Sequence, residues 1–289
     1  MRPIQRVLCP VDFTPLSDRE ISLAASLAER FEGELILQHN LSVGAALGVS
    51  WMHEKEHHKH DEIQQTAARA KLKELLDRVP QTVRARTRGA LTYGALDHCV
   101  QNMAEQANAD LIVIGTHVHH EAGHASETER LIRHAPCPVL TTHDDAPSEW
   151  LPSLGNGSAR IPTLVPIDFS AHAMAALGYA LDLGELLPLD VTALYVAGQD
   201  GRDERWAEAQ LVQTVARERR DKVNLEVREG QAAEQILAEE ELLGARLVVM
   251  GSHEWGLLER LLRRTASASL EVLRKSRCPV WYVPASAKR

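Results

Sequence analysis

The 289-residue sequence predicts an α/β protein of two tandem domains, each an open sheet of five parallel strands with helices on both faces. Two observations predict this fold: the chain repeats its own motifs in order, and short apolar runs alternate with amphipathic runs. The length is also natural for two domains. We therefore expect a first domain at residues 1–144, a linker at residues 145–160 and a second domain at residues 161–289.

The internal repeat fixes the domain organisation. VLCPVDFTPLSDREISLAASLAERFEGEL, from Val7, returns as TLVPIDFSAHAMAALGYALDLGELLPLDV, from Thr163, at an offset of 156 residues. ADLIVIGTH pairs with ARLVVMGSH at an offset of 136, and CPVL pairs with CPVW at an offset of 141. The changing offset shows that the first half holds about twenty extra residues before Gly94. We interpret residues 42–60, which include WMHEKEHHKH, as a His-rich insertion.

The expected elements follow in order along each half. Apolar runs at residues 7–11, 35–39, 111–115 and 138–142 are typical of parallel strands that are covered on both faces. Amphipathic runs predict helices at residues 21–31, 100–109, 173–187 and 232–245. Each half therefore reads strand, helix, strand, helix, strand, helix, strand, helix, strand. The Pro-, Gly- and Ser-rich segment between the halves is typical of a linker.

Composition excludes several classes of protein. The formal charge of −8 argues against a nucleic-acid partner or an anionic membrane surface. No apolar run approaches the roughly 18 residues that a membrane span needs. The N-terminus shows no signal peptide, and the four cysteines show no C-x-x-C spacing. We expect a cytoplasmic protein without disulfides, with no nucleic-acid partner and no membrane partner.

The repeated motifs P-x-D-F-[ST], G-[ST]-H and C-P-V, each present twice and in the same order, resemble those of the universal stress protein (UspA) family. The resemblance covers nearly the whole chain. It implies two Rossmann-like domains of the adenine nucleotide alpha hydrolase type. It also implies that ATP or another adenine nucleotide binds where the strands end at their carboxyl edge.

The resemblance assigns candidate nucleotide-binding residues in both halves. It implies a carboxylate near the adenosine and a glycine loop of the form G-x2-G-x9-G-[ST] around the phosphates. The matching residues are Asp12, Gly115, Thr116 and Ser126 in the first half, and Asp168, Gly251, Ser252 and Ser267 in the second.

Both loops depart from that pattern, because Val118 and Glu254 stand where the second glycine belongs. We therefore expect degraded ATP-binding loops, with nucleotide binding favoured in the second half. The alternative for the two aspartates is a polar group that ends a strand and caps the next helix. The alternative for Gly115 and Gly251 is a turn that needs room for the backbone.

Twelve of the fourteen histidines lie in the first half, and eight of them form two clusters after the second and fourth strands. Because both loops leave the same sheet edge, a divalent metal such as Zn or Ni could bind between them. The candidate ligands are His53, His57, His117, His120 and His124. The alternative is a solvated polar segment without a metal. H-E-x-x-H at residues 53–57 is interpreted as a chance match, because it lies in a charged insertion found in one copy.

The leading interpretation is a non-enzymatic, regulatory stress-response protein. The resemblance implies an internal pseudo-dimer through the apolar last strands, at residues 138–142 and 279–283. The chain would act as a monomer or as a homodimer of tandems, with an unknown protein partner. The alternatives are a nucleotide sensor or slow ATPase that uses the second half, and a metal-binding protein that uses the first.

Overall fold

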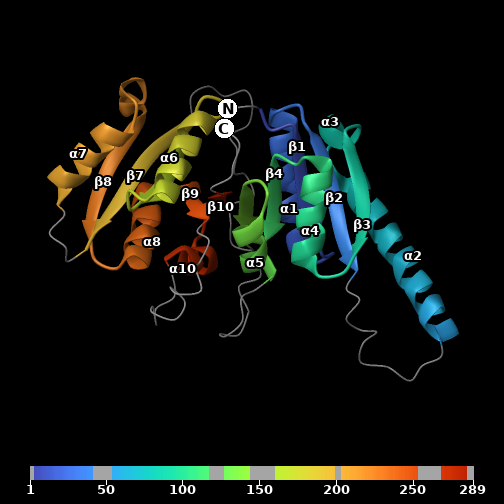
Figure 1. Ribbon diagram of the computed structural model, residues 1–289. Coiled ribbons are helices and arrows are strands. Elements are labelled where there is room, and N and C mark those ends of the chain that lie inside the picture. Colours follow the sequence, from blue (N-terminus) through green and yellow to red (C-terminus); the bar gives the residue numbers. More distant parts are fainter. Residues whose placement is uncertain are drawn as a thin grey trace. The chain divides into compact units, whose positions relative to one another are not determined.

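The computed structural model describes residues 3–41, 54–116, 127–143, 160–198, 203–252 and 268–284. Contacts between Cα atoms divide the chain into two compact units (Figure 1). Strands β1 to β4 belong to the first unit and β5 to β10 to the second. The last strand of the first repeat, β5, therefore belongs with the second unit. The domain boundaries at residues 144 and 161 stay a prediction.

The first unit is a four-stranded parallel sheet with the order β3-β2-β1-β4. In chain order the elements are β1 (Arg6–Val11), α1 (Leu16–Arg30), β2 (Glu34–Leu41), α2 (Glu54–Arg78), α3 (Gln81–Arg84), β3 (Thr87–Tyr93), α4 (Leu96–Ala107) and β4 (Leu111–Gly115), after which α5 (Glu127–His134) follows. Strands β2 and β3 lie on one side of β1, and β4 lies on its other side. The order therefore reverses between β1 and β4, which is where open sheets of this kind bind ligands.

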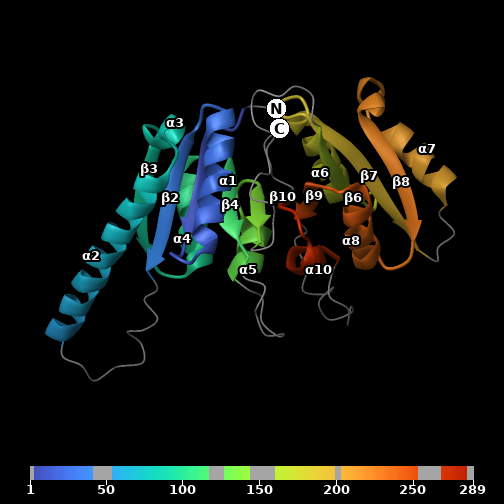
Figure 2. The same ribbon diagram turned by 180° about the vertical axis from the view of Figure 1, so that it is seen from behind.

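Helices cover both faces of this sheet. Helix α4 lies in front of the strands in Figure 1, and α1 lies in front of them in the reverse view of Figure 2. Helix α1 packs on β1, β2 and β4, whereas α2 packs on β2 and β3. The α1 face is apolar because Leu23, Ala24, Leu27 and Ala28 are buried at helical spacing.

The second unit has the strand order β5-β10-β9-β6-β7-β8. Its elements are β5 (Val139–Thr142), β6 (Ile161–Ile167), α6 (Ala171–Leu183), β7 (Leu189–Ala197), α7 (Glu204–Thr214), η2 (Arg217–Lys222), β8 (Val223–Glu229), α8 (Ala232–Leu243), β9 (Leu247–Ser252), α10 (Ala268–Lys275) and β10 (Val280–Pro284). All of its pairs are parallel except β10 with β5, which is antiparallel. The antiparallel pair joins the last strand of each repeat.

The two repeats share one strand register. Val11 in β1 pairs with His39 in β2, and 156 residues later Ile167 in β6 pairs with Tyr195 in β7. Val7 pairs with Leu111, and Thr163 pairs in the same way with Leu247. The predicted α/β class with two Rossmann-like domains is confirmed. The extra length of the first repeat appears partly as helix, because α2 has 25 residues and α7 has 11.

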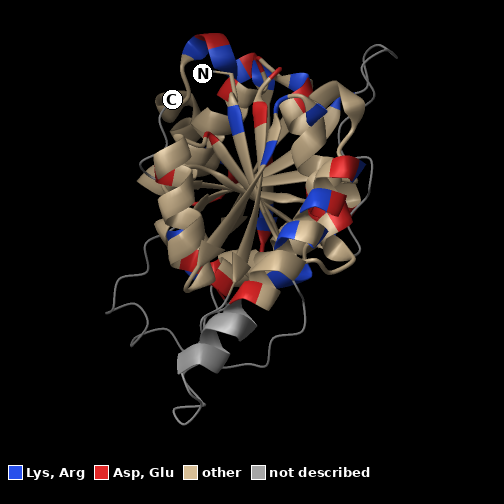
Figure 3. Cartoon of the chain, turned by 90° about the vertical axis from the view of Figure 1, so that its right-hand side faces the viewer, with Lys and Arg blue, Asp and Glu red and all other residues tan. Residues whose placement is uncertain are grey.

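The strands form the core of each unit. Figure 3 shows Lys, Arg, Asp and Glu mostly on helices and at strand ends, while the strands carry few charges. Leu8, Ile36 and Ile112 in the first unit, and Val248 and Trp281 in the second, have no exposed surface. This pattern is expected for parallel strands that helices cover on both faces. Within the described ranges, no helix combines the length and apolarity needed to cross a membrane.

Candidate functional site

The structure places the predicted aspartates and glycines at the carboxyl edges of neighbouring strands. Asp12 follows β1, and Gly115 ends β4, which pairs with β1. In the second unit Asp168 follows β6, and Gly251 lies at the end of the paired strand β9. Each half therefore brings its carboxylate and its glycine to the point where the strand order reverses.

The two aspartates differ in the number of hydrogen bonds that their Oδ1 atoms accept. Asp12 Oδ1 accepts hydrogen bonds from Thr14 N (2.9 Å), Thr14 Oγ1 (2.6 Å) and Ser17 Oγ (3.0 Å). Asp168 Oδ1 accepts one such bond, from Ser170 N at 2.9 Å. Both arrangements are turns closed by an aspartate side chain. Asp168 does not cap helix α6, because Ser170 Oγ takes that position and accepts from Ala173 N.

Gly115 and Gly251 are required by close packing against a helix. A Cβ atom at Gly115 would lie 2.5 Å from Leu16 Cδ2 in α1. A Cβ atom at Gly251 would lie 2.8 Å from the carbonyl oxygen of His172 in α6. Gly115 is the last residue of β4 and Gly251 the next to last of β9, and neither has a positive φ, so the need for room at the backbone comes from packing. The two glycines let the first helix of each repeat approach the fourth strand.

The first half has a buried carboxyl group at a position where the second half has none. The N–H of Gly115 donates to Oε1 of Glu20, which is 5% exposed. At the equivalent position, 156 residues later, the second half has Ala176, which is fully buried. When ionised, Glu20 sets a negative charge against this carboxyl edge of the sheet. A second anion there is disfavoured by repulsion at low dielectric.

The residue after each aspartate adopts a left-handed backbone. The φ angles of Phe13 and Phe169 are 64° and 59°. This conformation costs a side-chain-bearing residue about 1–2 kcal/mol. Aromatic contacts offset that cost in both halves. The Phe13 ring stacks on His39 with centroids 3.9 Å apart, and Lys71 Nζ lies 5.5 Å from the Phe13 centroid.

The second half carries a cluster of three aromatic rings at the same place. Phe169 lies 5.5 Å from Tyr195 and 5.2 Å from Trp206 between ring centroids, and Tyr195 lies 5.5 Å from Trp206. Trp206, from the first turns of α7, is part-exposed, whereas Tyr195 is buried. We call Phe169, Tyr195 and Trp206 the aromatic cluster. The sequence analysis missed it, although the repeated D-F-[ST] and the shared offset of His39 and Tyr195 were available signals.

The surroundings of His39 favour the neutral form of its imidazole. Its Nδ1 atom lies 2.8 Å from the carbonyl oxygen of Val11. Burial lowers the pKa of His39 below its ordinary value of 6.5, and the Val11 bond and the charge of Asp12 offset only part of this effect.

This lowered pKa predicts a pH dependence of stability. The folded chain binds the His39 proton less readily than the unfolded chain does, so the stabilisation is present above pH 6.5 and is lost as pH falls through the lower folded pKa. H39Q removes that titration. We expect wild type to lose stability relative to H39Q between about pH 7 and pH 5, measured by urea unfolding. A difference that stays constant over this range would contradict the assignment.

The hydroxyls of Thr116 and Ser252, which are predicted to meet phosphate, form hydrogen bonds with neighbouring segments in this structure. The Thr116 Oγ1 atom is hydrogen-bonded to Nδ1 of His143, and Thr116 N donates to Thr142 O at 2.8 Å. Ser252 Oγ donates to Val283 O at 3.4 Å. Thr116 and Ser252 are both 8% exposed. Their hydroxyls therefore connect strand ends in this structure.

Several predicted residues fall outside the described part of the chain. These are Ser126, Ser267, His53, His117, His120 and His124, together with the side chain of His57. Among the residues that are described, no three or more His, Cys, Asp or Glu side chains are placed to hold a metal ion. The Zn or Ni site and the absence of protease activity at residues 53–57 stay predictions.

The buried thiols of Cys9 and Cys278 are poorly suited to act as nucleophiles. Cys9, Cys137 and Cys278 are buried, and Cys99 is part-exposed. Burial raises the pKa of the Cys9 thiol well above its ordinary value, and Glu20 raises it further. Burial also raises the pKa of Cys278, with Glu240 adding to the effect. A thiol with a raised pKa holds little thiolate at neutral pH, so these two side chains serve packing.

Comparison with known proteins gives a consistent result. The sequence profile of the universal stress protein family matches residues 3–143 and again residues 162–284. A universal stress protein from Archaeoglobus fulgidus is 20% identical, with a TM-score of 0.70 over 97% of this chain and 98% of that one. A functionally unknown protein from Pseudomonas aeruginosa PAO1 is 14% identical, with a TM-score of 0.59 over 98% and 93%.

A universal stress protein solved in complex with cAMP is 20% identical, with a TM-score of 0.38 over 49% of this chain and 98% of that one. The two structures with TM-scores of 0.70 and 0.59 show a shared fold. Among curated proteins, none matches the sequence.

Proposed function

Because the chain belongs to the universal stress protein family and carries two of its domains, we propose that it is a regulatory stress-response protein whose second domain binds an adenine nucleotide. In this proposal the first domain has lost nucleotide binding. The observation that carries the proposal is the contrast between Glu20 and Ala176 at equivalent positions of the two carboxyl edges.

The second domain offers chemistry suited to a purine nucleoside. The part-exposed Trp206 belongs to the aromatic cluster at the carboxyl edge, and Asp168 lies one residue before Phe169. Base stacking on an aromatic ring is worth about 1–3 kcal/mol per base. Asp168 is exposed and its Oδ1 accepts a hydrogen bond from Ser170 N, so the carboxylate can also accept from a ribose hydroxyl.

The first domain is less suited to nucleotide binding than the second in three respects. Glu20 takes the Gly115 N–H, Asp12 Oδ1 already accepts three hydrogen bonds, and Lys71 lies over the Phe13 ring. A nucleotide would have to displace these contacts or approach a like charge. Both effects weaken binding relative to the second domain.

Binding without rapid hydrolysis is the expected behaviour. Glu254 stands where the family's phosphate loop has its second glycine. The second repeat therefore carries a carboxylate at a position where backbone N–H groups would approach phosphate. We expect weak binding, and a phosphate release rate that is the same with and without the D168N substitution. A release rate that D168N abolishes would identify an ATPase and contradict the non-enzymatic assignment.

W206A tests the nucleotide site directly. We expect the stripped wild-type chain to bind ATP in calorimetric titration, and W206A to bind about ten-fold more weakly, because ten-fold corresponds to the loss of about 1.4 kcal/mol of stacking. Y93A is the matched control, since Tyr93 is a 49% exposed aromatic residue of the first unit. Equal affinity in wild type and W206A would remove the support for a base stacked on the aromatic cluster.

We also propose that the β5–β10 pair makes the chain an internal pseudo-dimer, so that a second copy is not required. The pair is antiparallel, with Leu140 opposite Trp281, and every residue of both strands is buried. Sedimentation of the 32.0 kDa chain should therefore give a monomer at micromolar concentration. A stable homodimer would show that another surface is also used.

A further inference from the structure

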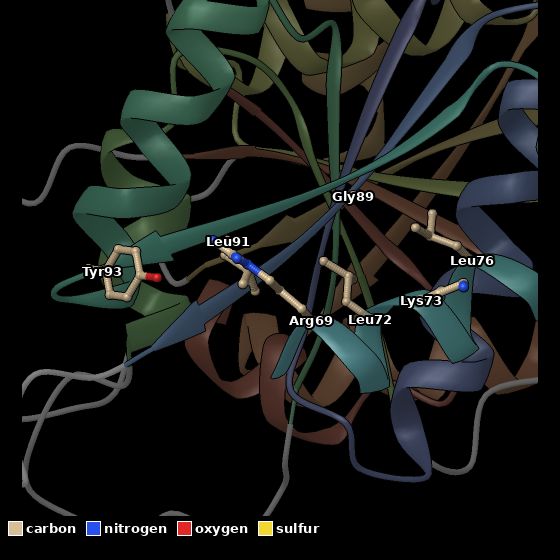
Figure 4. A pocket seen from close by; sticks show the side chains of 7 residues that line it. All are labelled: Arg69, Leu72, Lys73, Leu76, Gly89, Leu91 and Tyr93. Carbon is tan, nitrogen blue, oxygen red and sulfur yellow. The ribbon is translucent and has the colours of Figure 1, made fainter. Parts of the chain in front are cut away.

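A groove lies between helix α2 and strand β3 of the first unit, away from the carboxyl-edge site (Figure 4). Its volume is about 370 Å³. The lining combines cationic, apolar and aromatic side chains without a carboxylate. The lining residues are Arg69, Leu72, Lys73, Leu76, Gly89, Leu91 and Tyr93.

Gly89 allows the groove to form. A Cβ atom at Gly89 would lie 2.9 Å from Leu72 Cδ2 and 3.1 Å from Leu76 Cδ1. The absence of a side chain at Gly89 therefore lets α2 pack close to β3, with Leu72 and Leu76 against the strand backbone. In the second repeat, 136 residues later, Leu225 stands at this position. The groove is thus a feature of the first repeat.

The outer edge of β3 offers backbone hydrogen bonds. Within the described residues β3 pairs with β2 alone, so it is an edge strand of the first unit. Leu35 N donates to Arg86 O, and Gly94 N donates to Leu41 O, so even-numbered residues of β3 point their backbone groups toward β2. Gly89 and Leu91 therefore point their N–H and C=O groups away from β2. An unpaired edge of this kind accepts an added strand.

The rim of the groove is positively charged. Arg69 and Lys73 are exposed, and neither forms an ion pair with any described residue. Figure 4 shows both cations on the same stretch of α2, with Arg69 directed toward Leu91. Residues 62–93 hold seven Lys and Arg against three Asp and Glu, whereas the whole chain has a net charge of −8. This local surplus selects anionic partners over short distances, because salt screens the distant charges.

We propose that this groove binds an extended peptide of a partner protein that carries carboxylates at alternate positions. The peptide adds a strand to β3, and its carboxylates meet Arg69 and Lys73. The two cations are four residues apart, about 6 Å along the helix. Side chains on one face of a strand repeat about every 6.8 Å, so two acidic residues separated by one residue match them. The residue between the two carboxylates points to the opposite face of the added strand.

The test uses the full chain and a short fluorescein-labelled peptide of alternating valine and glutamate. We expect saturable binding in fluorescence anisotropy, and about ten-fold weaker binding by the double variant R69E/K73E, since two favourable charge pairs become repulsive. The matched control is R205E/R217E, which makes the same change of charge at exposed arginines of the second unit. Equal binding by R69E/K73E and wild type would overturn the proposal.

Two further probes separate strand addition from simple charge attraction. A peptide with glutamine in place of glutamate is expected to bind about ten-fold more weakly. One probe carries N-methyl groups on the valine amides and another on the glutamate amides. Because each removes donors from one edge of the peptide, one of the two should lose binding. If neither loses binding, or if the chain alone dimerises and R69E/K73E prevents it, the groove does not bind a peptide in this way.

Discussion

Replacing Trp281 by alanine is expected to lower the free energy of unfolding by about 3–5 kcal/mol, the largest effect we predict for a single substitution. Trp281 has no exposed surface and is the second residue of β10. It pairs with Leu140 of β5 on one side and with Val249 of β9 on the other. Its ring lies 6.0 Å from that of Tyr179 in α6. Truncation would leave a cavity that three elements line.

Urea unfolding of W281A, followed by circular dichroism, measures this loss. W281F is the matched comparison, because it keeps an aromatic ring in the same place and should lose clearly less stability. W206A should change stability less than W281A, since Trp206 is part-exposed. If W281A unfolds at the same urea concentration as wild type, β10 is not the centre of the core that the structure describes.

The second large effect is expected at Gly251, where valine should cost about 3 kcal/mol of stability. The added Cβ would lie 2.8 Å from the carbonyl oxygen of His172 and 3.0 Å from its carbonyl carbon. These are backbone atoms of α6, so the helix itself must move away from β9. A side-chain rotation cannot relieve the contact.

G244A distinguishes crowding from backbone strain. Gly244 ends α8 with φ at 57°, and a Cβ atom there would meet no atom within 4 Å. We expect G244A to cost about 1 kcal/mol through conformation alone, clearly less than G251V. Thermal unfolding of both variants gives the comparison. Equal losses would show that the approach of α6 to β9 is not the reason for the glycine.

The fold could be predicted from the sequence because its signals repeat. Both copies carry an apolar first strand followed by Asp-Phe and then Thr or Ser, and the offset of 156 residues reappears as an identical strand register. The predicted ends of the helices were less accurate than the predicted strands. The first helix begins at Leu16 although its apolar periodicity is clear only from Ile21. Proline at position 15 and the turn of Asp12 set that start locally.

The site was only partly predictable. The sequence identified Asp168 and Gly251, since both occur in a repeated motif. It did not indicate that Glu20 accepts a hydrogen bond from Gly115 N, because 95 residues separate them. The aromatic cluster was missed for the same reason: Trp206 comes from a helix whose sequence does not repeat in the first half. Contacts between segments that are distant in the sequence can be predicted only when the register of the sheet is known.

The proposed function therefore depends on a difference between two copies of one fold. The first half keeps the aspartate and the glycine but adds the Glu20 carboxyl group and three hydrogen bonds to Asp12. The second half keeps the same pair and adds the aromatic cluster. Because the backbone register is shared, side chains alone account for the expected difference in binding.

Calorimetric titration of ATP into the wild-type chain, D12N and D168N tests that difference most directly. Asparagine keeps the shape of the side chain and its acceptor oxygen, so the turns after β1 and β6 should persist. We predict one nucleotide per chain, with affinity lowered by D168N and unchanged by D12N. Two nucleotides per chain, or a loss of binding in D12N but not in D168N, would contradict the assignment of the site to the second domain.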